Sequence, residues 1–242
     1  MMQLEVKKGK IGDIPFHMVY PFNETGKSVI LYHGWSSSGK SQLTRAALLA
    51  LEGYTICVPD AVFHGERHPV SDYYTLESYD LFWKTIFNNI DEFPLLQEDF
   101  IKNGYQKPVI IGHSMGGMSV MGIAAKYGNE IEGAVSFNGS GDWELTHLFM
   151  QARFGYILGE NWSLLKEIRQ RSPLNHQTEM ESIPLLLING ETDETVDPRG
   201  QMHFYNVMKN RNERIKKIIY PQLGHFVTTN MMDDAVQWME EL

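Results

Sequence analysis

The chain has 242 residues, and its hydrophobic fraction of 43% is enough for one large domain with a full core. It carries 21 Lys and Arg against 30 Asp and Glu, and this net charge of −9 argues against nucleic acids and anionic membrane surfaces as partners. The first residues lack a basic segment followed by an apolar one, and no apolar run approaches the ~20 residues that cross a bilayer, so we expect a cytoplasmic protein.

The chain opens with a predicted antiparallel hairpin, and apolar runs then alternate with helical patterns. The hairpin strands are expected at Gln3–Lys8 and Ile14–Tyr20. Later strands are predicted at Ser28–Tyr32, Tyr54–Val58, Val109–Ile111, Gly133–Phe137, Leu185–Ile188 and Ile215–Tyr220. Helices are predicted at Ser41–Leu51, Leu76–Asn103 with Pro94 as a candidate break, Met115–Tyr127, Arg199–Lys209 and Asp233–Leu242. This alternation predicts an α/β fold with a mostly parallel, doubly wound sheet.

Segment 140–182 departs from the alternation, because it contains no clear strand. Its aromatic residues are Trp143, Phe149, Phe154, Tyr156 and Trp162. Short helices are expected at Trp143–Arg153 and Trp162–Arg171. An insertion of this length is long for a plain crossover, and functional loops follow strand carboxyl ends in such sheets. We interpret it as a helical cap within a single domain of residues 1–242; the alternative is that its aromatic residues only pack on the sheet.

Residues 112–116 form the most informative motif of the chain. They read G-x-S-x-G around Ser114, after the apolar run that ends at Ile111 and before the small-residue run from Met118 to Ala125. A strand, a sharp turn and a helix in this order expose the serine hydroxyl at a helix N-terminus. Serine becomes a useful nucleophile only when a base serves it, so the motif requires an acid and a histidine later in the chain.

Asp193 and His225 are the residues that best supply the acid and the base. Asp193 lies three residues beyond Gly190, where a predicted strand ends. Asp197 is a rival better suited to capping the next helix, and Asp142 is a weaker third choice. His225 follows the last predicted strand, whereas His203 lies inside a predicted helix. The order serine, acid, histidine then points to a catalytic triad at one edge of the sheet.

The backbone N–H groups of Met115 and Trp35 are the predicted oxyanion donors. Met115 begins the helix after the nucleophile. Trp35 and Ser36 follow Gly34 in the loop after the third strand, and of these two donors we choose Trp35. We expect His33 mainly to brace this loop by hydrogen bonding. The residues expected at the edge of the substrate pocket are His33, His113, Trp143, Phe149 and Phe154.

Residues 34–41 carry a competing signal, because they match G-x-x-x-x-G-K-[ST], the phosphate-binding loop of nucleotide hydrolases. The loop follows a predicted strand and precedes a predicted helix. However, it is rich in serine rather than glycine, and bulky Trp35 stands where the backbone would wrap a phosphate. A nucleotide hydrolase would also give no role to Ser114, Asp193 and His225. We therefore keep a nucleotide hydrolase only as a remote alternative.

These motifs together resemble the α/β-hydrolases of the serine esterase and prolyl-oligopeptidase-like group, and they are similar to small bacterial carboxylesterases. The resemblance covers the chain from about Ser28 onward. It rests on His33-Gly34-Trp35, Pro59-Asp60 with His64-Gly65-Glu66-Arg67, Gly112 to Gly117, Gly190 to Asp193, and Gly224-His225. It implies a loop beside the site at residues 60–67, and we take His64, Arg67 and His68 as structural or pocket-edge residues.

The resulting hypothesis is a serine hydrolase that cleaves a small-molecule carboxylic ester through an acyl-enzyme, without a metal or an organic cofactor. Thioester and small amide or peptide substrates remain alternatives on the same triad. A binding protein with the hydrolase fold is the alternative from another functional class. Aromatic and methionine residues of the cap favour an apolar group in the substrate.

Overall fold

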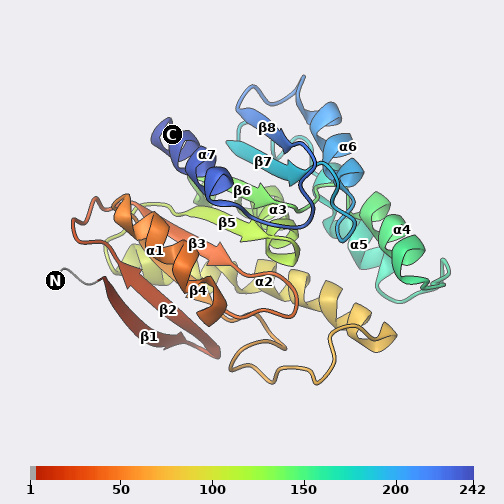
Figure 1. Cartoon of the computed structure of the whole chain (residues 1–242), viewed down its shortest axis with the longest axis horizontal. Coiled ribbons are helices and arrows are strands. Elements are labelled where there is room, and N and C mark those ends of the chain that lie inside the picture. The colour runs from red at the N-terminus through yellow and green to blue at the C-terminus, as the bar shows by residue number, and fades with distance from the viewer. Residues whose placement is uncertain (1–3) are drawn as a thin grey trace.

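A computed structural model describes residues 4–242, whose strands form one eight-stranded sheet (Figure 1). The strands are β1 Glu5–Ile11, β2 Ile14–Tyr20, β3 Ser28–Tyr32, β4 Thr55–Pro59, β5 Val109–His113, β6 Gly133–Phe137, β7 Leu185–Gly190 and β8 Ile215–Tyr220. Their order in the sheet is β1-β2-β4-β3-β5-β6-β7-β8. The β1–β2 hairpin is antiparallel and every pairing from β4 to β8 is parallel, which confirms the predicted hairpin and mostly parallel sheet; the hairpin also pairs with β4, in antiparallel orientation.

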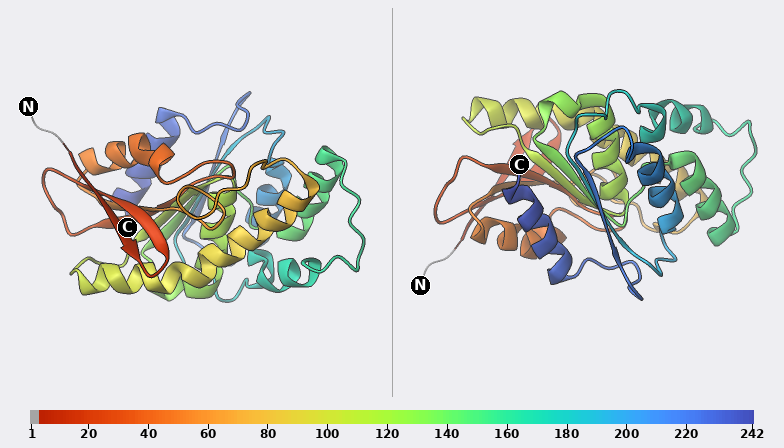
Figure 2. Two further views of the ribbon diagram at one scale, coloured as in Figure 1. Left: turned by 90° about the horizontal axis from the view of Figure 1, so that it is seen from below. Right: turned by 90° about the horizontal axis from the view of Figure 1, so that it is seen from above.

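Helices cover both faces of the sheet (Figure 2). The helices are η1 Lys40–Gln42, α1 Leu43–Leu51, α2 Leu76–Lys102, α3 Met115–Tyr127, η2 Gly128–Glu130, α4 Trp143–Phe154, α5 Leu165–Arg171, η3 Pro173–Asn175, α6 Pro198–Met208 and α7 Thr229–Glu240. One apolar cluster packs α1 and α7 on one face, and the other packs α2 and α3 on the opposite face. The strands from β3 to β7 are buried along their whole length except at His113, which explains their continuous apolar sequences.

Helix α2 runs through Pro94 without a break, so the candidate break at this residue is wrong. A proline inside a helix removes one backbone hydrogen bond and costs about 3 kcal/mol. Phe93 and Leu96, on either side of it, are almost fully buried in the α2–α3 cluster. Their packing outweighs the local cost, which the sequence pattern alone could not reveal.

Helix α7 begins at Thr229, four residues before the predicted start at Asp233. The hydroxyl of Thr228 accepts the N–H of Met231 at 3.2 Å and caps the helix there. At the other end of the chain, the predicted first strand started at Gln3, which lies outside the described residues; the strand is present from Glu5.

Residues 140–182 contain α4, α5 and η3 between β6 and β7, and no strand. Trp162 lies outside α5, contrary to the predicted helix from this residue, and its indole N–H donates to Asp80 on α2 at 2.9 Å. The segment lies beyond the carboxyl ends of the parallel strands (Figure 1). It is therefore placed beside the edge where the candidate site residues lie.

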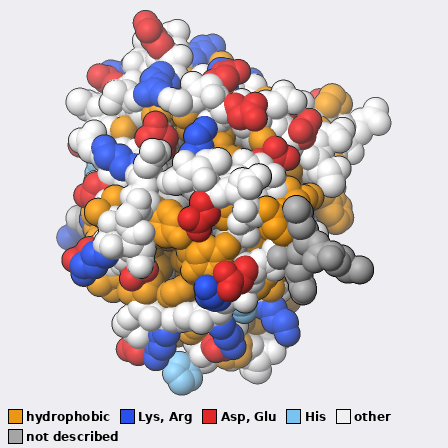
Figure 3. Space-filling model, turned by 90° about the vertical axis from the view of Figure 1, so that its left-hand side faces the viewer, with side chains coloured by type: hydrophobic (Ala, Val, Ile, Leu, Met, Phe, Trp, Pro, Cys, Tyr) orange, Lys and Arg blue, Asp and Glu red, His pale blue; other side chains and the backbone are white. Residues whose placement is uncertain are grey.

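The opposite face of the molecule, where the parallel strands begin, gathers hydrophobic side chains between charges of both signs (Figure 3). Within residues 4–242, no helix combines the length and the apolar character needed to cross a bilayer.

Candidate active site

Ser114 lies at the turn between β5 and α3 in a strained backbone conformation, with φ of 59° and ψ of −119°. A non-glycine residue in such a region costs on the order of 1–3 kcal/mol. A Cβ added to Gly112 would meet the carbonyl oxygen of Gly116 at 2.1 Å, and one added to Gly116 would meet that of Tyr32 at 2.4 Å. Only glycines let the strand and the helix approach this closely, and the approach holds Ser114 at the helix N-terminus.

Asp193 and His225 are in direct contact, although they come from the loops after β7 and β8. His225 Nδ1 lies 2.6 Å from Asp193 Oδ2. The other carboxylate oxygen accepts the N–H groups of Thr195 at 2.8 Å and Val196 at 3.0 Å, and the Asp193 side chain is fully buried. Because an ionised carboxylate only accepts hydrogen bonds, Nδ1 carries the imidazole proton and Nε2 is left to accept one.

Ser114 and His225 line the same cavity, which has a volume of about 590 Å³. Within residues 4–242 the Ser114 hydroxyl makes no hydrogen bond, so this candidate nucleophile and the candidate base His225 are not hydrogen-bonded to each other in the structure. Such contacts are often long without substrate and tighten when it binds. The structure thus joins Asp193 to His225 and places Ser114 on the wall of a cavity that His225 also lines.

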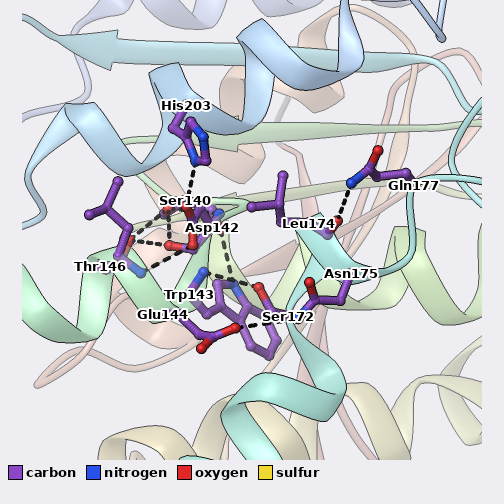
Figure 4. Close-up of polar contacts among 11 residues, drawn as sticks. Ser140, Asp142, Trp143, Glu144, Thr146, Ser172, Leu174, Asn175, Gln177 and His203 are labelled. Atoms are coloured by element: carbon purple, nitrogen blue, oxygen red, sulfur yellow. Dashed lines mark hydrogen bonds and ion pairs between the residues drawn. The ribbon is translucent and has the colours of Figure 1, made fainter.

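The two other carboxylates considered for the acid have different partners. Asp197 accepts the N–H of Arg199 at 3.0 Å and caps α6. Asp142 caps α4 through the N–H of Leu145 at 3.1 Å, and its second oxygen lies 2.7 Å from Nδ1 of His203 on α6 (Figure 4). This second Asp–His pair ties α4 to α6, and neither of its members lines the cavity of Ser114.

His33 fixes the peptide that carries the Trp35 N–H. Its Nδ1 donates to the carbonyl of Gly34 at 2.8 Å, and its Nε2 accepts the N–H of Ala61 at 3.1 Å. The C=O and N–H of a trans peptide point in opposite directions, so the Trp35 N–H points away from the histidine. Among residues 4–242 this N–H has no acceptor.

His64 braces the following peptide in the same way. Its Nε2 accepts the N–H of Ser36 at 3.3 Å, and its Nδ1 donates to the carbonyl of Val62 at 2.9 Å. Burial lowers the pKa of His64 to about 4 and also lowers the pKa of His33, so both rings are neutral near pH 7. Because Ser36 is engaged, Trp35 is the donor of this loop that remains free.

Asp60 anchors the loop after β3 to the loop after β4. Its carboxylate accepts the N–H of Gly39 at 2.7 Å and the N–H of Glu66 at 3.0 Å. Arg67 reaches back to helix α2 and makes a two-pronged ion pair with Glu92, at 2.7 and 2.6 Å. His68, in contrast, is exposed. The residues taken as structural in the sequence therefore divide into His64 and Arg67, which hold the loop, and a surface histidine.

The phosphate-loop alternative conflicts with the hydrogen bonds of residues 34–41. The N–H groups of Ser36, Ser37, Gly39 and Ser41 all donate to other groups of the protein. A phosphate loop needs such N–H groups free to converge on the anion. The side chain of Lys40 points to solvent, and the Trp35 ring packs against His64, Tyr73 and Phe82.

A second, narrower cavity also reaches Ser114, and its volume is about 90 Å³. Apolar and aromatic side chains from α2, the preceding loop and segment 140–182 form most of its wall. They include Tyr73, Tyr79, Phe82, Met150, Phe154 and Tyr156. Segment 140–182 therefore contributes directly to a cavity at Ser114.

The cavities at Ser114 are lined by two of the residues expected at the pocket edge, His113 and Phe154, but not by His33, Trp143 or Phe149. Trp143 is fully buried against Trp83, because α4 turns it into the core. Phe149 lies under the guanidinium of Arg199, 4.1 Å from its ring centre. These aromatic residues lie on the same helix but face different directions, which the sequence did not resolve.

Arg45 is one of the cavity residues that the sequence reasoning missed. It lies in the first turn of α1 and lines the 590 Å³ cavity. Nearby, burial, His225 and Arg45 together lower the pKa of His113 to about 3. Arg45 belongs to no recognisable motif. The only sequence signal that could have placed it at the site was its position in the helix that follows the loop of Trp35.

Within residues 4–242, no three His, Cys, Asp or Glu side chains are grouped to hold a metal ion. A model of the prolyl oligopeptidase family matches residues 42–241 of the chain. YitV of Bacillus subtilis (strain 168) is 26% identical over 254 residues, covering 98% of both chains. Esterase YjfP of Escherichia coli (strain K12) is 25% identical over 253 residues, covering 98% of this chain and 99% of its own.

The fold is similar to that of TT1662 from Thermus thermophilus, with a TM-score of 0.81 and 19% identity over 99% of this chain and 98% of that one. At this identity the similarity concerns the fold. This similarity of fold is consistent with the mostly parallel sheet described above.

Proposed function

The chain belongs to the prolyl oligopeptidase family, and on that premise we propose that it is a serine esterase acting through an acyl-enzyme on Ser114. The observation that carries the proposal is the buried contact of 2.6 Å between Asp193 and His225, whose ring lines one cavity with Ser114. The name of Esterase YjfP supports the choice of an ester.

In the proposed mechanism, His225 Nε2 removes the hydroxyl proton as Ser114 Oγ attacks the ester carbonyl carbon. The N–H groups of Trp35 and Met115 stabilise the oxyanion that forms. The tetrahedral intermediate expels the alcohol, which takes the proton from His225, and leaves the acyl group on Ser114. A water molecule then attacks the acyl carbon while His225 removes one of its protons, and His225 passes this proton to Ser114 Oγ as the carboxylic acid leaves. Asp193 holds the productive tautomer and stabilises the imidazolium.

The two cavities suggest how an ester lies in the site. His225 must reach the oxygen of the leaving alcohol to protonate it, and it lines only the larger cavity, which therefore receives the alcohol. The acyl group then enters the narrower, apolar cavity. An engineered apolar cavity of ~150 Å³ holds benzene, so about 90 Å³ fits an acyl chain of only a few carbons.

Thioesters and small amides remain alternatives on the same residues. The narrow acyl cavity favours a small substrate over a peptide, whose acyl side would carry a further residue. We accordingly rank peptide hydrolysis below ester hydrolysis.

The test measures hydrolysis of p-nitrophenyl acetate by the wild type, Ser114→Ala and Ser37→Ala, together with labelling by a fluorophosphonate. We expect Ser114→Ala to lose turnover and labelling, because the nucleophile is gone, while its circular dichroism spectrum stays unchanged. Ser37→Ala, which alters another serine of the cavity wall, controls for indirect effects and keeps its label. Undiminished turnover by Ser114→Ala would refute the assignment.

A further inference from the structure

Arg45 is a half-buried cation on the wall of the cavity that we assign to the leaving alcohol. Burial lowers the pKa of its guanidinium, although the group stays charged at neutral pH. Among residues 4–242, none of the ion pairs includes Arg45, and its one side-chain hydrogen bond is to Gln42. A guanidinium offers five N–H donors, so most of them have no partner in the protein.

The surroundings of Arg45 contain no compensating negative charge. The lining of the cavity includes Arg153 as a second cation and no Asp or Glu. Arg153 has a partner, since it makes an exposed ion pair with Glu194 at 3.2 Å. Arg45 is thus a free positive charge in a chain whose net charge is −9. Partial burial without a carboxylate carries a desolvation cost, and an anionic ligand in the cavity would offset it.

Several serine hydroxyl groups near Arg45 can also donate hydrogen bonds. Ser36, Ser37 and Ser41 line the cavity with hydroxyl groups, and they belong to the serine-rich loop that the triad does not use. Gln42 holds Ser37 Oγ at 3.0 Å and the Arg45 guanidinium together. A planar guanidinium with adjacent hydroxyls matches the geometry of a carboxylate or a phosphate.

We propose that the preferred substrates are esters whose alcohol carries an anionic group, a carboxylate or a phosphate, which Arg45 binds. The inference rests on the proposed function, because it uses the placement of the alcohol on the side of His225. It predicts a short apolar acyl group and a charged alcohol in one substrate. Arg45 acts as a specificity residue and takes no part in the bond-breaking steps.

The experiment compares three acetate esters of para-substituted phenols: 4-acetoxybenzoate, 4-acetoxyphenyl phosphate and the neutral 4-acetoxybenzamide. The wild type, Arg45→Gln, Arg45→Lys and Lys40→Gln are assayed for kcat/KM on each. Lys40→Gln is the matched control, since it removes an exposed positive charge that is five residues away and does not line the cavity. The measured quantity is the ratio of kcat/KM for an anionic ester to that for the neutral ester, so intrinsic reactivity cancels between variants.

We expect this ratio to fall about ten-fold or more in Arg45→Gln, because a charge-assisted hydrogen bond is lost. Arg45→Lys should restore part of it, and Lys40→Gln should change it by less than about two-fold. A fall for the carboxylate alone or the phosphate alone identifies which anion the cavity takes. A ratio unchanged in Arg45→Gln overturns the inference while the esterase assignment stands.

A wild type that hydrolyses none of the three esters would overturn the proposed function itself. Should Arg45→Gln fail to fold, inhibition of the wild type by the products decides the question. The expected result is stronger inhibition of the wild type by 4-hydroxybenzoate than by 4-hydroxybenzamide, with a difference that shrinks as salt is added. Equal inhibition by the two phenols would contradict an anion site.

Discussion

At the scale of single residues, Asp193 is a buried carboxylate of the candidate site with both oxygens hydrogen-bonded. It accepts hydrogen bonds from two backbone N–H groups and from His225, and its side chain has no exposed surface. The two backbone bonds fix one carboxylate oxygen and aim the other at the imidazole. The residue therefore determines which ring nitrogen of His225 carries a proton.

We predict that Asp193→Asn lowers kcat on p-nitrophenyl acetate by about 10³-fold or more, with little change in the circular dichroism spectrum. Asparagine retains the oxygen that accepts the two N–H groups, and its amide then faces the ring and favours the wrong tautomer. Asp197→Asn is the control, because Asp197 caps α6 only four residues away, and we expect its kcat to stay within about two-fold. A kcat of Asp193→Asn within ten-fold of the wild type would contradict the role of Asp193.

At the scale of elements, the loop after β3 depends on two buried neutral histidines. His33 and His64 each accept one backbone N–H and donate to one carbonyl, a pattern that only the neutral ring can make. Protonation of either ring would replace an acceptor by a donor. The hydrogen bonds that hold the loop of the Trp35 N–H should therefore be lost in acid.

For His64 the sign of the pH effect follows from its pKa of about 4, against an ordinary value of 6.5 in the unfolded chain. Between these values the unfolded chain binds the proton and the folded protein does not, so stability falls as the pH falls from 6.5 to about 4. This lowering of the pKa corresponds to a loss of roughly 3 kcal/mol in the free energy of unfolding across that pH range. Urea unfolding of His64→Gln should show a shallower pH dependence over this range than the wild type.

His68→Asn is the control for this measurement, because His68 is exposed and asparagine tolerates its positive φ of 53°. Its pH dependence should match that of the wild type. Parallel curves for the wild type and His64→Gln would show that His64 is not held neutral.

At the scale of the whole molecule, the narrow cavity is assembled from segments that are distant in the chain. Trp35, Tyr79 and Met150 come from a loop, helix α2 and the cap segment, and they meet only because the sheet brings their elements to one edge. Its volume of about 90 Å³ depends on this packing. The acyl preference that we propose therefore depends on the tertiary structure.

We predict that Met150→Ala enlarges this cavity and shifts the preference toward longer acyl chains. The ratio of kcat/KM for p-nitrophenyl hexanoate to that for the acetate should rise several-fold, because the removed side chain makes room for added methylenes. Met208→Ala controls for lost stability, since Met208 is also buried in the same apolar cluster but lines neither cavity. Each substitution is expected to lower the free energy of unfolding by about 2–5 kcal/mol. An equal rise of the kcat/KM ratio in both variants would exclude a specific effect of Met150 on the cavity.

The sequence by itself determined the elements and their parallel arrangement, because buried strands leave continuous apolar runs and the G-x-S-x-G turn needs glycine where backbones nearly touch. It also predicted that Asp193 and His225 lie together, since residues after the carboxyl ends of neighbouring parallel strands come together at one edge, and the two side chains are 2.6 Å apart. Only the tertiary structure decided that α2 continues through Pro94, that Trp143 and Phe149 lie away from the cavities, and that Arg45 lines one. These outcomes depend on which elements pack together and on the direction of each side chain, and a local pattern of residues carries no information about either.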